Sequence, residues 1–88
     1  MNNLERVHLI KQKLTEKFSP VNINVIDDSP QHRGHKGAEN GAGHFTIEIT
    51  AAAFAGKSLL ERHRLIYTAL DDLMHSEIHA LSIKANSP

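Results

Sequence analysis

A strongly signalled helix between two strand-like segments constrains the fold of this chain more than any other feature. Ser58 is a favourable N-cap residue, and Glu61 stands three residues later, where its side chain completes a capping box. Gly56 lies just before this cap and suits the left-handed residue that ends a preceding short helix, for which Thr50 is the expected cap. The residues behind Ser58 that recur at helical spacing, and predict one buried face, are Leu60, His63, Ile66, Tyr67, Leu70, Leu73 and Met74.

Three segments carry the pattern of β-strands. Residues 21–25 and 44–50 alternate between apolar and polar side chains, which predicts two strands that each bury one face. Residues 78–83 predict a closing strand, in which His79 heads the inward row of Leu81, Ile83 and Ala85. A histidine at the head of an apolar row makes His79 the first candidate functional residue.

A further helix is predicted before these strands. Asn2 or Asn3 is placed to cap it. Ser19 precedes Pro20, which disfavours the helical conformation for Ser19, so the helix is predicted to end near Phe18. Its apolar stripe is expected to comprise Leu4, Val7, Ile10, Leu14 and Phe18. Its solvated residues are expected to be Glu5, Arg6, Lys11, Lys13 and Glu16.

The order of elements predicts an α+β fold in one domain that spans residues 1–88. The order is helix, strand, strand, helix, helix, strand, and three strands leave one sheet face for the helices to cover in a two-layer sandwich. The first two strands can pair as an antiparallel hairpin. The helical crossover makes the second and third strands parallel if they share a sheet, although the pattern does not say which strands are neighbours.

Composition excludes several classes of function. The chain has no cysteine, which excludes disulfides, thiol catalysis and metal sites built only of thiolates. Ten Lys and Arg residues balance ten Asp and Glu residues, which argues against a protein bound mainly through nucleic-acid phosphates. The start of the chain lacks the pattern of a signal peptide, and no apolar run reaches membrane-spanning length, so the predicted location is cytoplasmic.

Histidine is the outlier in the composition, with seven residues, of which three lie from His32 to His44. His35 stands in a Gly-rich loop without periodicity, between Gly34 and Gly37, and such glycines allow a ligand loop unusual backbone conformations. From the residues alone, an exposed loop histidine explains His35 as well, and a core histidine bonded to the backbone explains His79 as well.

No motif in the chain predicts catalysis. The patterns of a nucleophile elbow, a phosphate loop and a metalloprotease helix are absent from the sequence. A domain of this size is also not expected to enclose a large pocket. We therefore expect a protein that is not an enzyme and that has no small-molecule substrate.

Five segments of the chain together resemble the BolA family. The resemblance implies a fold like the type II KH domain, which agrees with the order of elements above. It also implies two activities: partnership with monothiol glutaredoxins around a shared [2Fe–2S] cluster, and DNA binding in transcriptional regulation. The segments are Gly34-His35-Lys36-Gly37, Gly43-His44-Phe45, Phe54-Ala55-Gly56-Lys57-Ser58, Arg62-His63-Arg64-Leu65-Ile66-Tyr67 and Ile78-His79-Ala80-Leu81-Ser82-Ile83.

The resemblance assigns the family's metal ligands to His79 and to the loop residue His35, with His44 as a further candidate for the second position. A histidine in the loop, in place of cysteine, indicates the histidine-bearing subgroup. Iron–sulfur clusters are usually held by thiolates, and imidazoles can replace them on one iron. A chain with two imidazoles and no thiolate offers half a site, so the isolated chain is expected to hold no cluster.

The implied role is that of a non-enzymatic adaptor in iron–sulfur cluster assembly, cluster trafficking or iron regulation. The alternative is a DNA-binding transcriptional regulator of stress or morphology that uses a helix-turn-helix-like segment. Its candidate nucleic-acid contacts are Lys57, Arg62 and Arg64. No membrane contact is expected in either role.

Overall fold

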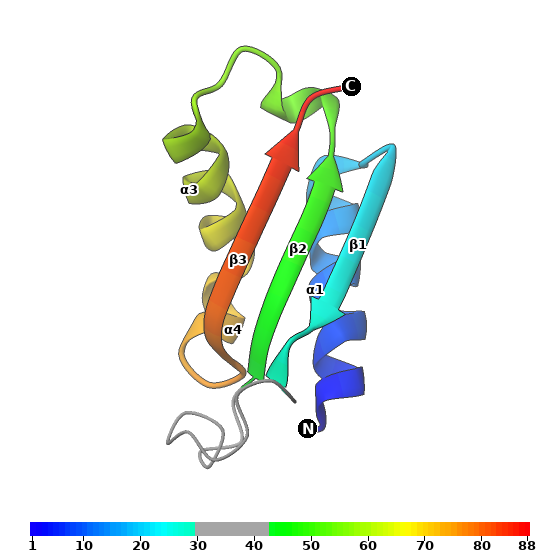
Figure 1. Ribbon diagram of the computed structural model, residues 1–88, viewed down its shortest axis with the longest axis vertical. Helices are drawn as coiled ribbons and strands as arrows, with labels where there is room; N and C mark the ends of the chain where they lie inside the picture. The colour runs from blue at the N-terminus through cyan, green and yellow to red at the C-terminus, as the bar shows by residue number, and fades with distance from the viewer. Residues whose placement is uncertain (30–42) are drawn as a thin grey trace.

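The computed structural model describes residues 1–29 and 43–88 as a three-stranded sheet with helices (Figure 1). Its elements are α1 (Asn3–Phe18), β1 (Asn22–Asp27), β2 (Gly43–Thr50), the 3-10 helix η2 (Ala52–Phe54), α3 (Leu59–Ala69), α4 (Asp71–Met74) and β3 (Ile78–Asn86). The strand order is β1-β2-β3, with β1 antiparallel to β2 and β2 parallel to β3. The predicted α+β class is confirmed. Most of the loop predicted between the first two strands, with His32 and His35, lies outside the described residues.

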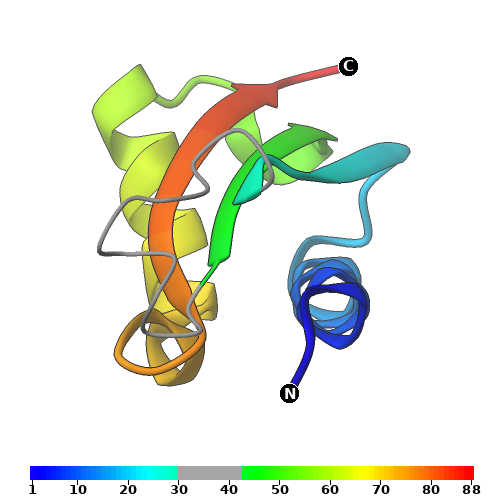
Figure 2. The ribbon, with the colours of Figure 1, turned by 60° about the horizontal axis from the view of Figure 1, so that its bottom comes forward.

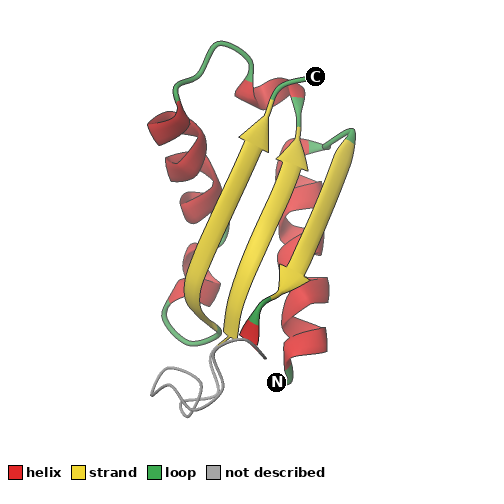
Figure 3. Ribbon diagram, viewed as in Figure 1, coloured by secondary structure: helices red, strands yellow, loops and turns green. Residues whose placement is uncertain are grey.

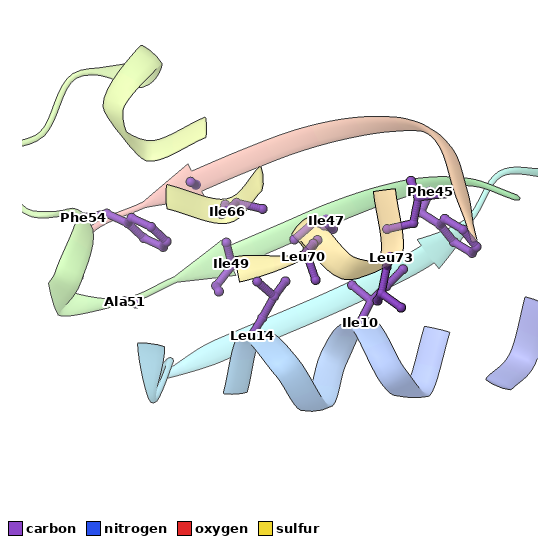
Figure 4. Packing of buried hydrophobic residues seen from close by; sticks show 12 residues of the cluster. Ile10, Leu14, Phe45, Ile47, Ile49, Ala51, Phe54, Ile66, Leu70 and Leu73 are labelled. Carbon is purple, nitrogen blue, oxygen red and sulfur yellow. The ribbon is translucent and has the colours of Figure 1, made fainter. Parts of the chain in front are cut away.

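The described helices cover one face of the sheet (Figures 2 and 3). The core lies between this helical layer and β2, whose alternate residues are buried. Figure 4 shows side chains of α1, α3 and α4 meeting those of β2. The large side chains of this core are Ile10, Leu14, Phe45, Ile47, Ile49, Phe54, Ile66, Leu70 and Leu73. None of the described helices is long and apolar enough to cross a bilayer.

Helix α1 begins and ends as its sequence predicts, but one of its charged residues is buried. The Asn2 side chain accepts a hydrogen bond from the backbone N–H of Glu5 at 2.8 Å, and the helix ends at Phe18. Leu4 in the first turn is exposed, whereas Arg6, expected on the solvated face, is 9% exposed. The expectation for Arg6 was wrong because a distant residue, Glu77, pairs with its guanidinium.

The predicted capping box of α3 is present. The Ser58 hydroxyl accepts from Glu61 N at 3.1 Å, and the Glu61 carboxylate accepts from Ser58 N at 2.9 Å. Gly56 has the expected positive φ, 73°. The prediction that Thr50 caps the preceding short helix was wrong, because η2 begins after Ala51 and has no side-chain cap.

The long predicted helix is two helices, and its buried face is narrower than its apolar pattern. Leu70, with φ −104° and ψ 11°, separates α3 from α4. Leu60 and Tyr67 are 58% and 40% exposed, so their predicted burial was wrong. One turn before the buried Ile66, the half-buried Arg62 reaches the sheet and donates to the Ala85 carbonyl at 2.8 Å. Leu60 and Tyr67 therefore lie on the flank of α3.

The start of β3 contains an irregularity that changes which side chains face the core. Gly43 pairs with Ile78 and His44 pairs with Ala80, so His79 is an extra residue between two pairs. Ile78 is buried, whereas His79 and Ala80 are both exposed. The prediction that His79 heads the inward row was wrong, since strict alternation assumes an unbroken ladder and one inserted residue re-aims a side chain.

Gly43 opens β2 where there is no room for a side chain. A Cβ atom on Gly43 would lie 2.4 Å from Cζ of Phe45 and 3.0 Å from Oδ1 of Asn3. The Phe45 ring is 1% exposed and cannot move into solvent without leaving the core. Glycine is therefore required here by contact with neighbours.

We expect Ser58→Ala to lower the free energy of unfolding by about 1 kcal/mol, because the variant leaves an N–H group of the first turn of α3 without its acceptor. Urea unfolding followed by circular dichroism measures this change. Ser87→Ala, beyond the end of β3, is the matched control and should change the free energy by less than about 0.5 kcal/mol. Equal effects of the two variants would contradict the assigned cap.

We expect Gly43→Ala to cost about 2–3 kcal/mol of unfolding free energy, because the added methyl overlaps the buried Phe45 ring. Gly56→Ala is the comparison, since its Cβ meets no atom within 4 Å and only its positive φ is strained. That strain should cost about 1 kcal/mol. A smaller loss for Gly43→Ala than for Gly56→Ala in urea unfolding would count against the close approach.

Candidate functional site

Two of the candidate metal ligands lie side by side at one end of the sheet. The ring centroids of His44 and His79 are 4.8 Å apart, with the ring planes at 45°. His44 belongs to the row of β2 that points away from the core, because Phe45 and Ile47 occupy the inward row. The inserted residue in β3 brings the His79 ring beside it. The third candidate, His35, lies outside the described residues.

The main chain of His44 is hydrogen-bonded to the residues that follow β1. His44 N donates to the Ser29 hydroxyl at 3.0 Å, and His44 O accepts from Asp28 N at 2.8 Å. The Asp28 carboxylate in turn accepts a hydrogen bond from the Thr46 hydroxyl. These contacts hold the backbone of His44 from both sides.

A shallow hollow of about 200 Å³ lies on the sheet beside His44. It is open because the neighbouring β3 residues Ala80 and Ser82 have short side chains. His44 contributes to the lining of this hollow, and Nε2 of its imidazole is buried. Its lining residues are Asp28, His44, Phe45, Ala80, Leu81 and Ser82.

Helix α1 reaches this end of the sheet through Arg6. Its Nε donates to the Glu77 carboxylate at 2.9 Å, and its Nη1 donates to Oδ1 of Asn3 at 2.7 Å. The hydrogen bond from Arg6, with a second from Ser76, holds the pKa of Glu77 below its usual value. The Glu77 carbonyl also accepts from Gly43 N at 3.1 Å. Sequence periodicity gave no sign of this pairing, because the two charged residues are 71 positions apart.

The donor set suits half of a metal site better than a whole one. In residues 1–29 and 43–88, no group of three or more His, Cys, Asp or Glu side chains could hold a metal ion. A structural zinc site normally takes four protein ligands, which these residues do not supply. Imidazole is a nitrogen donor that one iron of a [2Fe–2S] cluster can accept, so His44 and His79 are suitable in ligand type for half of such a site.

The structure changes the set of candidate nucleic-acid contacts. The guanidinium of Arg62 donates to the carbonyl oxygens of Lys57 at 3.0 Å and Ala85 at 2.8 Å, which ties it to the protein's own backbone. Lys57 and Arg64 remain exposed and line a hollow of about 340 Å³ together with Lys17 of α1. Lys17 was missed because no local pattern places the last turn of α1 beside α3.

Comparison with known proteins places the chain in a family. The family model for BolA-like proteins matches residues 14–88. SufE-like protein 1 of Arabidopsis thaliana is 46% identical over 84 residues, which are 90% of this chain and 23% of that protein. The structure of the BolA domain of SufE1 from the same plant superposes with a TM-score of 0.85 at 47% identity, covering 94% of this chain and 92% of that one.

A bacterial relative supports the same assignment. The DNA-binding transcriptional regulator BolA of Escherichia coli is 35% identical over 74 residues, which cover 84% of this chain and 68% of that protein. The chain spans less than a quarter of the length of SufE-like protein 1, so the match concerns the BolA region of that relative. On the family match and these relatives, the chain belongs to the family of BolA-like proteins.

Proposed function

We propose that this chain is a non-enzymatic BolA-like adaptor that shares a [2Fe–2S] cluster with a monothiol glutaredoxin, in cluster assembly, cluster trafficking or iron regulation. The observation that carries the proposal is the pair of imidazoles of His44 and His79, with ring centroids 4.8 Å apart. Several matched relatives are named as regulators or BolA-like proteins and not as enzymes, which agrees with an adaptor role.

The number of ligands that a [2Fe–2S] cluster needs determines how many this chain would have to supply. A [2Fe–2S] cluster takes four protein or thiol ligands in its usual form. A monothiol glutaredoxin brings one cysteine and one bound glutathione, so a partner chain without cysteine must supply two other ligands. His79 is the proposed anchor. His35 or His44 is the proposed second ligand; the His44 ring lies beside His79, and His35 lies outside the described residues.

We expect His79→Ala to abolish the spectrum of the mixed cluster, because it removes the anchor imidazole. The measurement is titration of cluster-loaded glutaredoxin with each variant, followed by visible circular dichroism and by pulsed electron paramagnetic resonance for nitrogen coupling. Acid should weaken the mixed cluster, because only a neutral imidazole has the nitrogen lone pair that binds the metal, and a proton would occupy that lone pair.

Two other histidines are the controls for this experiment. His8→Ala, on the exposed face of α1, should leave the spectrum unchanged, and the half-buried His63 should affect mainly stability when replaced by alanine. The comparison of His44→Ala with His35→Ala decides the second ligand. An unchanged spectrum and unchanged nitrogen coupling in His79→Ala would show that the ligand assignment is wrong.

A second candidate function, DNA-binding regulation, is favoured by a specific observation. Lys17, Lys57 and Arg64 line one hollow, which Glu61 also lines. In the described part of the chain none of the three cations forms a salt bridge within 4.0 Å. The Escherichia coli relative is named as a DNA-binding transcriptional regulator. With a net charge of zero, the chain offers few phosphate contacts, so DNA binding is expected to be weak and sensitive to salt.

If this second function holds, we expect the triple variant Lys17→Ala/Lys57→Ala/Arg64→Ala to lose DNA affinity. The slope of log affinity against log salt should also fall by roughly 3, about one unit for each cation. Fluorescence anisotropy with a labelled duplex over a salt series measures both quantities. Lys11→Ala, exposed on α1, is the control. Equal affinity and slope in the triple variant and the parent would remove this group from the candidate contacts.

A further inference from the structure

Arg6 is a buried cation whose partner, Glu77, is only partly buried. It is 9% exposed, and its guanidinium is paired with Glu77 at 2.9 Å and bonded to Asn3 at 2.7 Å. Burial of a charge is costly unless the charge is paired. Buried ion pairs can often be replaced by apolar residues without loss of stability. The residues that Arg6 contacts show which part of the chain this pair holds in place.

The partner of Arg6 touches the start of both strands that carry the histidines. Glu77 stands two residues before His79, and its carbonyl accepts from Gly43 N at 3.1 Å. Gly43 directly precedes His44. Glu77 N also donates to Leu73 O at 2.9 Å, which fixes the turn after α4. Glu77 therefore connects α1, through its carboxylate, to the first residue of β2, through its carbonyl.

The second partner of Arg6, Asn3, also lies close to Gly43. Asn3 Oδ1 lies 3.0 Å from the position that a Cβ atom on Gly43 would occupy. Arg6, Asn3, Glu77 and Gly43 thus form one connected group, the Arg6 clamp. The register shift that inserts His79 falls between Gly43 and His44, immediately beside this group.

We propose that Arg6 is a positioning residue for the imidazole pair, and that the Arg6 clamp sets the placement of His79 beside His44. The inference rests on the proposed function in one respect, which is that His44 and His79 act as metal ligands. The clamp acts through hydrogen bonds with defined directions, which an apolar contact of equal stability would lack.

The test separates positioning from stability by removing both charges together. The double variant Arg6→Met/Glu77→Leu leaves no unpaired buried charge and should unfold at a urea concentration close to that of the parent. Two quantities are then measured: nuclear Overhauser contacts between the His44 and His79 rings without metal, and the affinity for Zn²⁺ by isothermal titration calorimetry. Zn²⁺ serves as a probe that two imidazoles bind weakly without forming a complete zinc site. We expect the ring contacts to be lost and the Zn²⁺ affinity to fall by about 10- to 100-fold.

A milder variant and two controls complete the experiment. Arg6→Lys keeps the charge but loses the second hydrogen bond, to Asn3. It should therefore show a smaller fall in the ring contacts and in the Zn²⁺ affinity. Lys13→Met/Asp72→Leu removes an exposed ion pair, 2.7 Å long, that joins α1 to α4 without touching the clamp. Leu14→Ala weakens the core and leaves the clamp intact. Both controls should keep the ring contacts and the Zn²⁺ affinity.

Each outcome bears on a different claim. Parent-like ring contacts and affinity in both the double variant and Arg6→Lys would overturn the proposal and leave Arg6 as an ordinary stabilising ion pair. Loss of ring contacts in the Leu14→Ala control as well would also overturn it, because any destabilised variant would then disperse the rings. If His79→Ala keeps the mixed-cluster spectrum while the clamp variants lose the ring contacts, the proposed ligand function fails and the positioning role stands.

Discussion

The candidate site depends on one extra residue in β3. In an unbroken ladder His79 would share the inward row of Leu81 and Ile83, and its ring would face the core. The shift between the Gly43–Ile78 and His44–Ala80 pairs frees His79 from that row while Ile78 stays buried. Because the side-chain period of a strand is two, only such an insertion lets the same strand keep its apolar row and place a histidine beside His44.

The two-layer architecture separates the two groups of candidate residues. All described helices lie on one sheet face, so the inward row of β2 must be apolar and His44 points the other way. The imidazole pair lies where β2 and β3 begin, whereas Lys17 and Lys57 lie toward the opposite end, where α1 ends and α3 starts (Figure 1). The imidazole pair and the hollow lined by Lys17, Lys57 and Arg64 are therefore separate surfaces.

Sequence periodicity predicted the elements well because it reports local constraints. The cap of α1 at Asn2, the Ser58–Glu61 capping box, the left-handed Gly56 and the pairing directions follow from nearest neighbours in the chain or from chain direction. Two of the missed features depend on distant contacts. Arg6 is buried because it pairs with Glu77, 71 positions away. The Arg62 guanidinium donates a hydrogen bond to the Ala85 carbonyl, 23 positions away. The position of His79 depends on a register that alternation assumes to be regular.

The Arg6–Glu77 ion pair beside the insertion is part-buried, and its hydrogen bonds have defined directions that an apolar contact lacks. The later part of β3 is held in register by its inward apolar row, but its first residues have only Ile78 as an apolar anchor. Ile78 alone would hold the strand against the core without specifying how the chain departs from the ladder at His79. At that point the Glu77 carbonyl accepts a hydrogen bond from Gly43 N, and the Glu77 carboxylate accepts one from Arg6. These two directional bonds fix the path of the chain. If His44 and His79 are metal ligands, as proposed, holding both in place before a partner arrives lowers the conformational entropy that is lost when the metal binds.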